Sequence, residues 1–191
     1  MHIILGSRSS RRRELLAGME FPFTAVDINA DEHYPSELTA GDIPLYISRA
    51  KADAYTNVLD PDELLITSDT IVWLDGEVMG KPGNMAAAEA MLRRLSGRTH
   101  QVYTAVTFVH MQGNQRIVES AVDCTDVTFR PLSDEQIHFY VTHYQPLDKA
   151  GAYGIQEWIG YTGVESIHGS FFTVMGFPTH LVYDYVNKLK K

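Results

Sequence analysis

The sequence predicts an α/β fold for its 191 residues, and three observations support this class. Short apolar segments typical of strands alternate with segments whose apolar residues recur at helical spacing. The second half opens with two long strand patterns joined by a polar turn at Gly113-Asn114, which predicts a β-hairpin. No linker, repeat or low-complexity segment divides the chain. We therefore expect one domain over residues 1–191, built as two lobes with a cleft between them.

The expected strands are apolar runs bounded by turn-forming residues. Asp69 directly follows one such run, and the turn Asp75-Gly76 ends the next. We expect strands at His2–Leu5, Phe21–Ile28, Leu64–Ser68, Ile71–Leu74, His100–Met111 and Arg116–Phe129.

The expected helices rest on periodicity and on capping residues. Ser9 or Ser10 can cap a helix, and Ser133 with Gln136 forms a capping box. We expect helices at about Arg11–Ala17, at 42–58, at Met85–Leu95, from the Ser133 cap to about His143, and after Phe177-Pro178. A Gly-rich loop, Leu147–Gln156, precedes the last of these.

Composition restricts the class of protein. The net charge of −8 argues against a nucleic-acid polymer as partner, because such binders need a positive field. No apolar stretch approaches the roughly 20 residues that span a bilayer, so we expect a cytoplasmic protein without a membrane partner. The single cysteine, Cys124, excludes an intramolecular disulfide, and we expect it to be buried as a small apolar residue in its strand.

A basic cluster stands out in this acidic chain. Arg8, Arg11, Arg12 and Arg13 place four of the 16 Lys and Arg residues within six positions. Such a cluster is typical of a site for a small anion, although a solvated helix start explains it equally well.

Several common catalytic signatures do not fit. The segment Gly76–Lys81 resembles a phosphate-binding loop but is one residue short, and Pro82 stands where Ser or Thr would ligate magnesium. No G-x-S-x-G motif is present, which argues against a serine hydrolase. The eight histidines lack the spacing of metal ligands, so we expect no structural zinc.

Polar residues at the ends of strands remain as site candidates. Ser7–Arg12 follows the first expected strand and opens a helix, a position that favours an anion. Asp69 ends another strand, and a carboxylate there suits a hard cation such as Mg²⁺ or simply caps a turn. Lys51 and Lys81 are also site candidates, although each taken alone is more often a solvated surface lysine.

Taken together, these segments resemble the Maf family of nucleotide pyrophosphatases over nearly the whole chain. Each motif is weak singly, but their order and spacing are specific. The segments are Ser7-Arg8-Ser9-Ser10-Arg11-Arg12, Lys51-Ala52, Ser68-Asp69-Thr70, Gly80-Lys81-Pro82, Leu95-Ser96-Gly97-Arg98-Thr99-His100 and the loop Leu147–Gln156. One departure is Ser10, which replaces the family's proline. Proline would preset the first helical turn, whereas serine can cap it, so we expect the loop to keep its form.

The resemblance implies both a fold and an activity. The fold would be an elongated mixed sheet flanked by helices, with two lobes and a central cleft, like that of the inosine triphosphatases (the Maf/Ham1 fold). The activity would be hydrolysis of dTTP and UTP, with modified pyrimidine nucleotides as further candidates, to the monophosphate and pyrophosphate. A divalent cation, Mg²⁺ or Mn²⁺, would assist attack of water at the α-phosphate. The nucleoside triphosphate is then the main partner, and a homodimer is expected.

The resemblance also implies roles for single residues. Asp69 would be the catalytic carboxylate; Ser7, Arg12, Lys51 and Lys81 would bind the substrate; Arg11, Thr70 and Gln156 would select the base; and Asp69 with Glu32 would hold the metal. A triphosphate carries about four negative charges, so neutralising them would be most of the chemistry. The alternative is a nucleotide-sensing protein that regulates cell division and septum formation through a partner.

Overall fold

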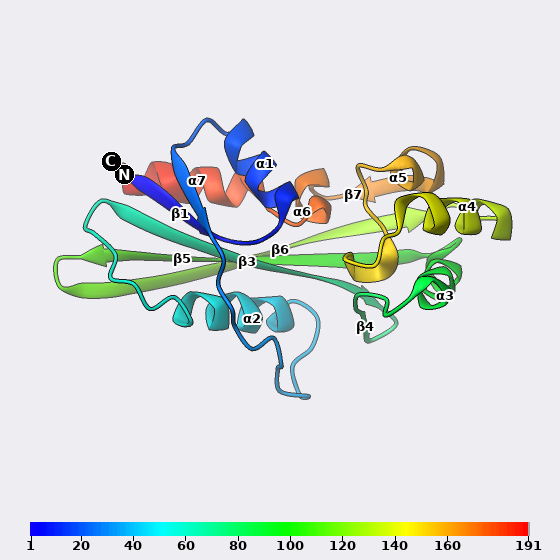
Figure 1. Cartoon of the computed structure of the whole chain (residues 1–191), viewed down its shortest axis with the longest axis horizontal. Coiled ribbons are helices and arrows are strands. Elements are labelled where there is room, and N and C mark those ends of the chain that lie inside the picture. The colour runs from blue at the N-terminus through cyan, green and yellow to red at the C-terminus, as the bar shows by residue number, and fades with distance from the viewer. Residues whose placement is uncertain (191) are drawn as a thin grey trace. The chain divides into compact units, whose positions relative to one another are not determined.

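The computed structural model describes residues 1–190, which form a seven-stranded mixed sheet flanked by helices (Figure 1). The strands are β1 (His2–Gly6), β2 (Phe23–Val26), β3 (Glu63–Leu74), β4 (Glu77–Met79), β5 (Thr99–Gln112), β6 (Gln115–Phe129) and β7 (Val164–His168). The helices are α1 (Ser10–Gly18), α2 (Asp42–Asp53), α3 (Met85–Leu95), α4 (Asp134–Tyr144), α5 (Trp158–Gly163), α6 (Phe171–Met175) and α7 (Thr179–Leu189), with a 3₁₀ turn, η1, at Ala150–Ala152. The predicted α/β class with a mixed sheet is confirmed.

The strands follow the order β2-β1-β3-β5-β6-β7, and β4 pairs with β3 outside this path. β1 is parallel to both β2 and β3, whereas β4 is antiparallel to β3 and β7 is antiparallel to β6. Gly6 at the end of β1 lies opposite Thr67 of β3. The loop after β1 therefore starts at the same edge as the segment of β3 that carries Asp69.

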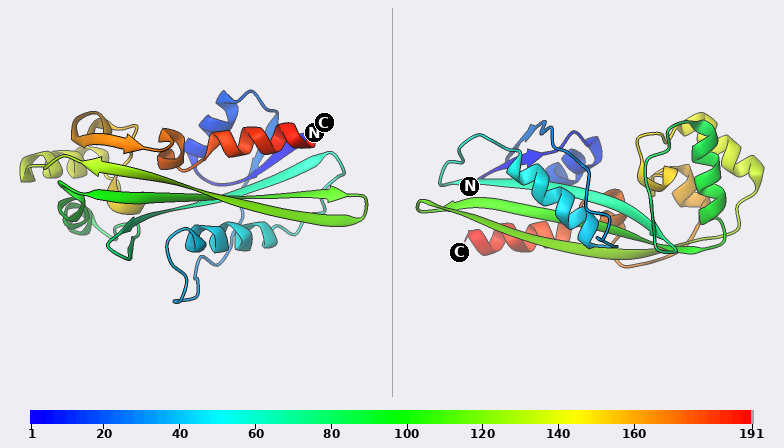
Figure 2. Two further views of the ribbon diagram at one scale, coloured as in Figure 1. Left: turned by 180° about the vertical axis from the view of Figure 1, so that it is seen from behind. Right: turned by 90° about the horizontal axis from the view of Figure 1, so that it is seen from below.

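The chain forms two compact units. The first contains Met1–Asp69, Thr104–Asp123 and the chain from Gly176 onward, and the second contains Thr70–Tyr103 and Cys124–Met175. In the first unit, α1 and α7 lie on one face of the strands and α2 lies on the other (Figures 1 and 2). The side chains of neighbouring strand residues point to opposite faces of the sheet, because a strand repeats every two residues.

The core of the first unit shows this alternation directly. Leu64 and Ile66 of β3 pack in the cluster that contains Leu16 of α1 and Val182 of α7. Leu65, between them, packs in a separate cluster with Ala52 of α2. The face of β3 that carries residues 65, 67 and 69 is therefore the face that α2 covers.

The second unit has a core of its own. Helices α3, α4 and α5 contribute Leu92, Tyr140 and Ile159 to a cluster that also contains Phe129 of β6 and Tyr153 of the Gly-rich loop. Tyr140 and Ile159 are at most 1% exposed. The loop is thereby packed into the apolar interior of its unit.

Several expected boundaries were wrong. The helix predicted for 42–58 ends at Asp53, where the guanidinium of Arg116 binds the carbonyl of Ala52 at 3.1 Å and forms an ion pair with Asp53. The segments predicted as two strands, Leu64–Ser68 and Ile71–Leu74, are the single strand β3. Strand β2 is shorter than Phe21–Ile28.

The expected burial of Cys124 was also wrong, although it does lie in a strand. Thr125, Val127 and Phe129 of β6 are buried, whereas Cys124 lies on the other face and is exposed. The strand was predicted correctly, but the expected burial placed Cys124 on the wrong face of it.

Strands β4 and β7 and helices α5 and α6 were not predicted; each is six residues or shorter, and a run of that length carries little periodic signal. Within residues 1–190, no helix is both long and apolar enough to cross a membrane.

Candidate active site

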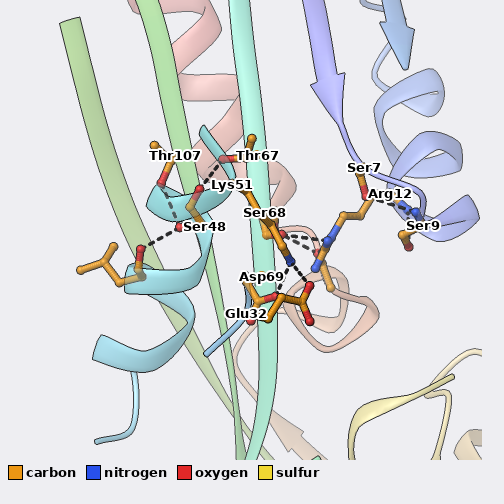
Figure 3. A network of polar contacts seen from close by, with 12 residues as sticks. Ser7, Ser9, Arg12, Glu32, Ser48, Lys51, Thr67, Ser68, Asp69 and Thr107 are labelled. Carbon is orange, nitrogen blue, oxygen red and sulfur yellow. Dashed lines mark hydrogen bonds and ion pairs between the residues drawn. The ribbon is translucent and has the colours of Figure 1, made fainter. Parts of the chain in front are cut away.

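A buried ion-pair cluster lies where β3 meets α2 (Figure 3). The ammonium of Lys51 is 2.7 Å from Oδ1 of Asp69 and 2.8 Å from Oε1 of Glu32. The side chains of Lys51 and Asp69 are each 13% exposed, whereas that of Glu32 is 54% exposed. One ammonium thus bridges two carboxylates, one deep in the fold and one near the surface.

Local structure explains why Lys51 meets Asp69. Asp69 shares its face of β3 with Leu65 and Thr67, the face that α2 covers. Lys51 lies in the last turn of α2, next to Ala52, which packs on that face. The helix therefore directs a long cationic side chain along the sheet to the carboxylate.

The surroundings of Asp69 favour a reactive carboxylate. Burial raises the pKa of Asp69 above its ordinary value, and the charges of Lys51 and then Arg12 oppose that rise. A carboxylate with a raised pKa is a better proton acceptor than a solvated one. The neighbouring cations keep it available as an anion.

Arg12 connects the loop after β1 to the ion pair of Lys51 and Asp69. Its Nε donates to the carbonyl of Gly176 at 2.8 Å, and its Nη1 donates to the carbonyl of Ser68 at 2.9 Å. Ser68 is the residue before Asp69, so the guanidinium lies beside the carboxylate and is influenced by its charge and by that of Glu32. Burial lowers the pKa of Arg12, because the charged guanidinium is less stable when water is removed from it.

The loop that carries Arg12 is internally hydrogen-bonded. Ser9 caps α1 by accepting from the backbone N–H of Arg12, so the expected cap at Ser9 or Ser10 is Ser9. The hydroxyl of the buried Ser7 accepts from the N–H of Ser9 at 3.2 Å, and Arg13 donates to the carbonyl of Ser7. Arg11 is half-buried and its charge lowers the pKa of Arg12.

The arginine cluster divides into two parts. Arg8 and Arg13 form ion pairs with Asp27, at 3.6 Å and 3.3 Å, and their side chains are 69% and 43% exposed. Arg12 instead turns into the fold. The solvated helix start therefore describes Arg8, whereas Arg12 and Arg13 both bind backbone carbonyls.

The remaining predicted site residues belong to the second unit. Thr70 follows Asp69 in β3 and is half-buried, and Lys81 is exposed in the turn after β4. The turn is tied to the Gly-rich loop because the N–H of Gly151 donates to the carbonyl of Gly80 at 3.1 Å. Gly151 has a φ of 66° and its Cα faces Val72 so closely that a Cβ would lie 3.0 Å from a Val72 methyl group. A glycine is therefore needed there, because both the positive φ and the close approach of Val72 disfavour a side chain.

Gln156 ends that loop with an unsatisfied acceptor. Its Oε1 is buried and has no hydrogen-bond partner among the described residues. An orphaned buried acceptor is costly unless a ligand or water supplies a donor. Gln156 therefore does not use its carbonyl oxygen to satisfy the loop backbone, which was the alternative to a role in base selection.

Sequence reasoning missed a second buried network in this unit. Lys149, 8% exposed, forms ion pairs with Asp148 at 2.8 Å and Glu157 at 3.3 Å. Tyr140 donates its hydroxyl to Glu157 and accepts from the N–H of Gly154. The network binds the backbone at Gly154, two residues before Gln156, and the side chain of Glu157, directly after it. Lys149 was visible as the only lysine of the Gly-rich loop, but the contact of its partner Glu157 with Tyr140 of α4 depends on tertiary packing.

The carboxylate pair suits a divalent cation. Mg²⁺ is usually held by one or two carboxylates together with substrate phosphates, rather than by a cage of protein ligands. Asp69 and Glu32 supply two such carboxylates around one cationic centre, the ammonium of Lys51. Within residues 1–190, no group of three or more His, Cys, Asp or Glu side chains is arranged to hold a metal. Two carboxylates alone would leave most ligand positions of such a cation to phosphate and water oxygens.

Comparison with known proteins places the chain. It matches the family of Maf-like proteins over residues 2–189 and belongs to that family. It is 54% identical to a dTTP/UTP pyrophosphatase of Phocaeicola vulgatus and 50% identical to one of Bacteroides thetaiotaomicron. Each alignment covers 98% of this chain and 95% of the relative.

Solved structures give weaker likenesses. A nucleoside-triphosphatase (dITP/XTP pyrophosphatase) from Mycobacterium abscessus is 16% identical, with a TM-score of 0.43 over 100% of this chain and 97% of that one. The Ham1 protein of Staphylococcus aureus is 15% identical, with a TM-score of 0.41 over 67% of this chain and 72% of that one. Both TM-scores lie below 0.5, so neither likeness by itself establishes a shared fold.

Proposed function

We propose that this protein hydrolyses dTTP and UTP to the nucleoside monophosphate and pyrophosphate. The observation that carries the proposal is the buried pair of Lys51 and Asp69, 2.7 Å apart, with Arg12 beside it. That cluster occurs in a chain about half identical, over 98% of its length, to proteins named dTTP/UTP pyrophosphatase. We treat residues 1–191 as one functional domain because the family match spans residues 2–189.

Cationic side chains bind the triphosphate in this proposal. Lys51 and Arg12 offer positive charge in a partly dehydrated environment, where charge interactions are stronger than in water. Ser7 lies in the loop that leads to Arg12, and its hydroxyl and the loop N–H groups are assigned to phosphate oxygens. Lys81, exposed in its turn, is assigned to the same substrate.

Asp69 orients the attacking water and accepts its proton. A carboxylate is a weak base for free water, so its pKa, raised by burial, brings it closer to the task. Asp69 and Glu32 are the residues that would hold a divalent cation, Mg²⁺ or Mn²⁺, which would supply positive charge to acidify water and neutralise phosphate. The ammonium of Lys51 is assigned to a phosphate oxygen.

Selection of the base is assigned to Arg11, Thr70 and Gln156. Uracil and thymine present acceptor, donor and acceptor along O4, N3–H and O2, whereas cytosine has an acceptor at N3. The buried Oε1 of Gln156 lacks a donor, which the N3–H of uracil or thymine would supply, while the amide N–H₂ of Gln156 would donate to O4. The Gln156→Glu variant loses that second bond, because a carboxylate cannot donate to O4. Tyr140 binds the N–H of Gly154 and the side chain of Glu157, which fixes the loop close to Gln156.

A nucleotide panel tests the substrate. Wild type and the Gln156→Glu variant are incubated with dTTP, UTP, CTP and GTP in the presence of Mg²⁺ or Mn²⁺, and released pyrophosphate is measured. We expect wild type to prefer UTP over CTP by about 10²-fold in kcat/KM and the variant to lose that preference. The exposed change Gln112→Glu is the control and should keep it. A wild-type preference of less than a few-fold contradicts the assignment.

The same panel separates the enzyme from a nucleotide-sensing regulator. A regulator would bind these nucleotides without releasing pyrophosphate from any of them. The cytoplasmic location and the homodimer that the resemblance implies belong to this proposal as well. Sedimentation of the purified chain tests the dimer directly.

A further inference from the structure

A chain of buried hydroxyl groups lies directly beside the ion pair of Lys51 and Asp69 (Figure 3). Ser48, Thr67 and Thr107 are each 0% exposed, although the strands and helix around them are mostly apolar. Buried hydroxyl groups are retained at a cost unless they are hydrogen-bonded, and these three bond to one another and to the backbone. Nothing in the proposed reaction uses them directly.

The central contact of this chain links α2 to β3. The hydroxyl of Thr67 donates to the backbone carbonyl of Ser48 at 2.7 Å. Ser48 stands three residues before Lys51 on α2, so the two residues lie on one face of the helix, about 4.5 Å apart along its axis. Thr67 stands two residues before Asp69 on β3, so these two share a face of the strand, about 6.6 Å apart.

The two pairs form a ladder between the helix and the strand. Its first rung is the bond from Thr67 to the Ser48 carbonyl, and its second is the ion pair of Lys51 and Asp69. A shift of α2 along β3 that broke the first rung would also move the start of the Lys51 side chain relative to Asp69. The first rung therefore determines how far along β3 the Lys51 side chain begins.

Further hydroxyl contacts hold the helix from the other side. The hydroxyl of Ser48 lies 2.9 Å from that of Thr107 on β5, which lies 3.0 Å from that of Ser120 on β6. Arg49 of α2 then donates to Ser120 at 3.0 Å. The helix is thus fixed to three neighbouring strands by hydrogen bonds as well as by apolar packing. Hydrogen bonds are directional, whereas apolar packing is much less so.

We propose that Thr67 is a positioning residue that sets the register of α2 and thereby places the ammonium of Lys51 against Asp69. The proposal rests on the proposed function, because it assumes that Lys51 and Asp69 act on the triphosphate. Thr67 is 0% exposed, so its effect on the triphosphate would be transmitted through α2.

Two matched pairs of variants isolate the hydroxyl. Thr67→Val keeps the shape of threonine and removes its donor, whereas Thr67→Ser keeps the donor and removes a methyl group. Thr67→Ala and Thr67→Ser differ only in the hydroxyl and serve if the valine variant does not fold. Thr125→Val is the control, because Thr125 is a fully buried threonine that donates to a backbone carbonyl, that of Ser170, at 3.1 Å and has no link to Lys51.

The readouts are kcat/KM for UTP and thermal stability, measured on the same preparations. We expect Thr67→Val to lower kcat/KM about tenfold, with Thr67→Ser close to wild type, because small misplacements of a catalytic charge are costly. Thr67→Ser should nevertheless be less stable than wild type, because it leaves a small cavity. Activity and stability would then rank the two variants differently, which a purely structural role does not produce. The Thr125→Val control should lose stability and keep its activity per folded molecule.

A double-mutant cycle with Lys51→Ala completes the test. If Thr67 acts through Lys51, Thr67→Val causes no further loss once Lys51 is removed, whereas independent effects add. A tenfold loss that persists in the Lys51→Ala background, or a Thr67→Val variant as active as wild type, overturns the inference. If Lys51→Ala alone is fully active, the assignment of Lys51 in the proposed function fails as well, so the two failures are distinguishable.

Discussion

At the scale of single residues, the proposed hydrolysis depends on Asp69 and on the two cations beside it. Asp69 is buried, has a raised pKa and is paired with Lys51 at 2.7 Å. A buried carboxylate that served only to cap a turn would need neither the ammonium nor the guanidinium of Arg12. Glu32, more than half exposed on its side chain, is the partner that solvent reaches.

The first prediction is that Asp69→Asn keeps the fold and loses about 10²-fold or more in kcat. Asparagine has nearly the same shape, so packing is retained, but it cannot accept the proton of water or balance a metal charge. Steady-state kinetics with UTP and thermal melting measure the two effects. Asp75→Asn, which breaks an exposed ion pair with Arg98, is the control and should leave kcat unchanged. Near-normal turnover of Asp69→Asn would move the catalytic role to another carboxylate, with Glu32 next.

The site residues were predictable to different degrees. Strand ends and the resemblance indicated Asp69, Lys51, Arg12 and Glu32, and the structure brings these four together. The hydroxyl of Thr67 gave no usable signal, and Lys149 was visible only as the single lysine of its loop. The bond of Thr67 to a helix carbonyl and the burial of the Lys149–Glu157 pair depend on tertiary packing.

At the scale of secondary-structure elements, long periodic segments were predicted well and short ones were not. Helix α3 spans Met85–Leu95 as expected, because alanine, methionine and leucine dominate it and Asn84 caps it. Helix α2 ends earlier than expected, before Thr56, Asn57 and Val58, which are weak helix formers. The bond of Arg116 to the carbonyl of Ala52 at its end comes from a distant part of the chain, and no local pattern indicates it.

The second prediction concerns the capping box of α4. The Ser133 hydroxyl accepts from the N–H of Gln136, whose side chain accepts in turn from the N–H of Ser133. Ser133→Ala removes one of these bonds and should lower the free energy of unfolding by about 1 kcal/mol. Urea titration followed by circular dichroism measures this change. Activity per folded molecule should be unaffected, and a stability equal to wild type would show that the cap does not limit α4.

At the scale of the whole molecule, the stability of the fold should depend on the buried His100. Its side chain is 0% exposed, its Nε2 lies 2.7 Å from the Tyr153 hydroxyl, and its Nδ1 has no partner among the described residues. Burial lowers the pKa of His100 to about 4 from the usual 6.5. The unfolded chain therefore binds a proton at this residue before the folded chain does.

The third prediction follows from the sign of that shift. The contribution of the neutral His100 is fully present above about pH 6.5 and is lost progressively as the pH falls toward about 4. Over that window it amounts to about 3 kcal/mol of unfolding free energy. His100→Gln should unfold with a shallower pH dependence between these limits than wild type, whatever its stability at neutral pH. Parallel pH curves for the two proteins would show that His100 titrates normally in the fold.

The central claim, that water attacks the α-phosphate of a pyrimidine nucleoside triphosphate, is tested most directly by phosphorus NMR of the products formed in ¹⁸O-labelled water. With UTP and Mg²⁺ or Mn²⁺, the account predicts UMP and pyrophosphate as the first products, with the ¹⁸O isotope shift on the UMP phosphorus. Orthophosphate as the first product, or the label on pyrophosphate, would contradict it.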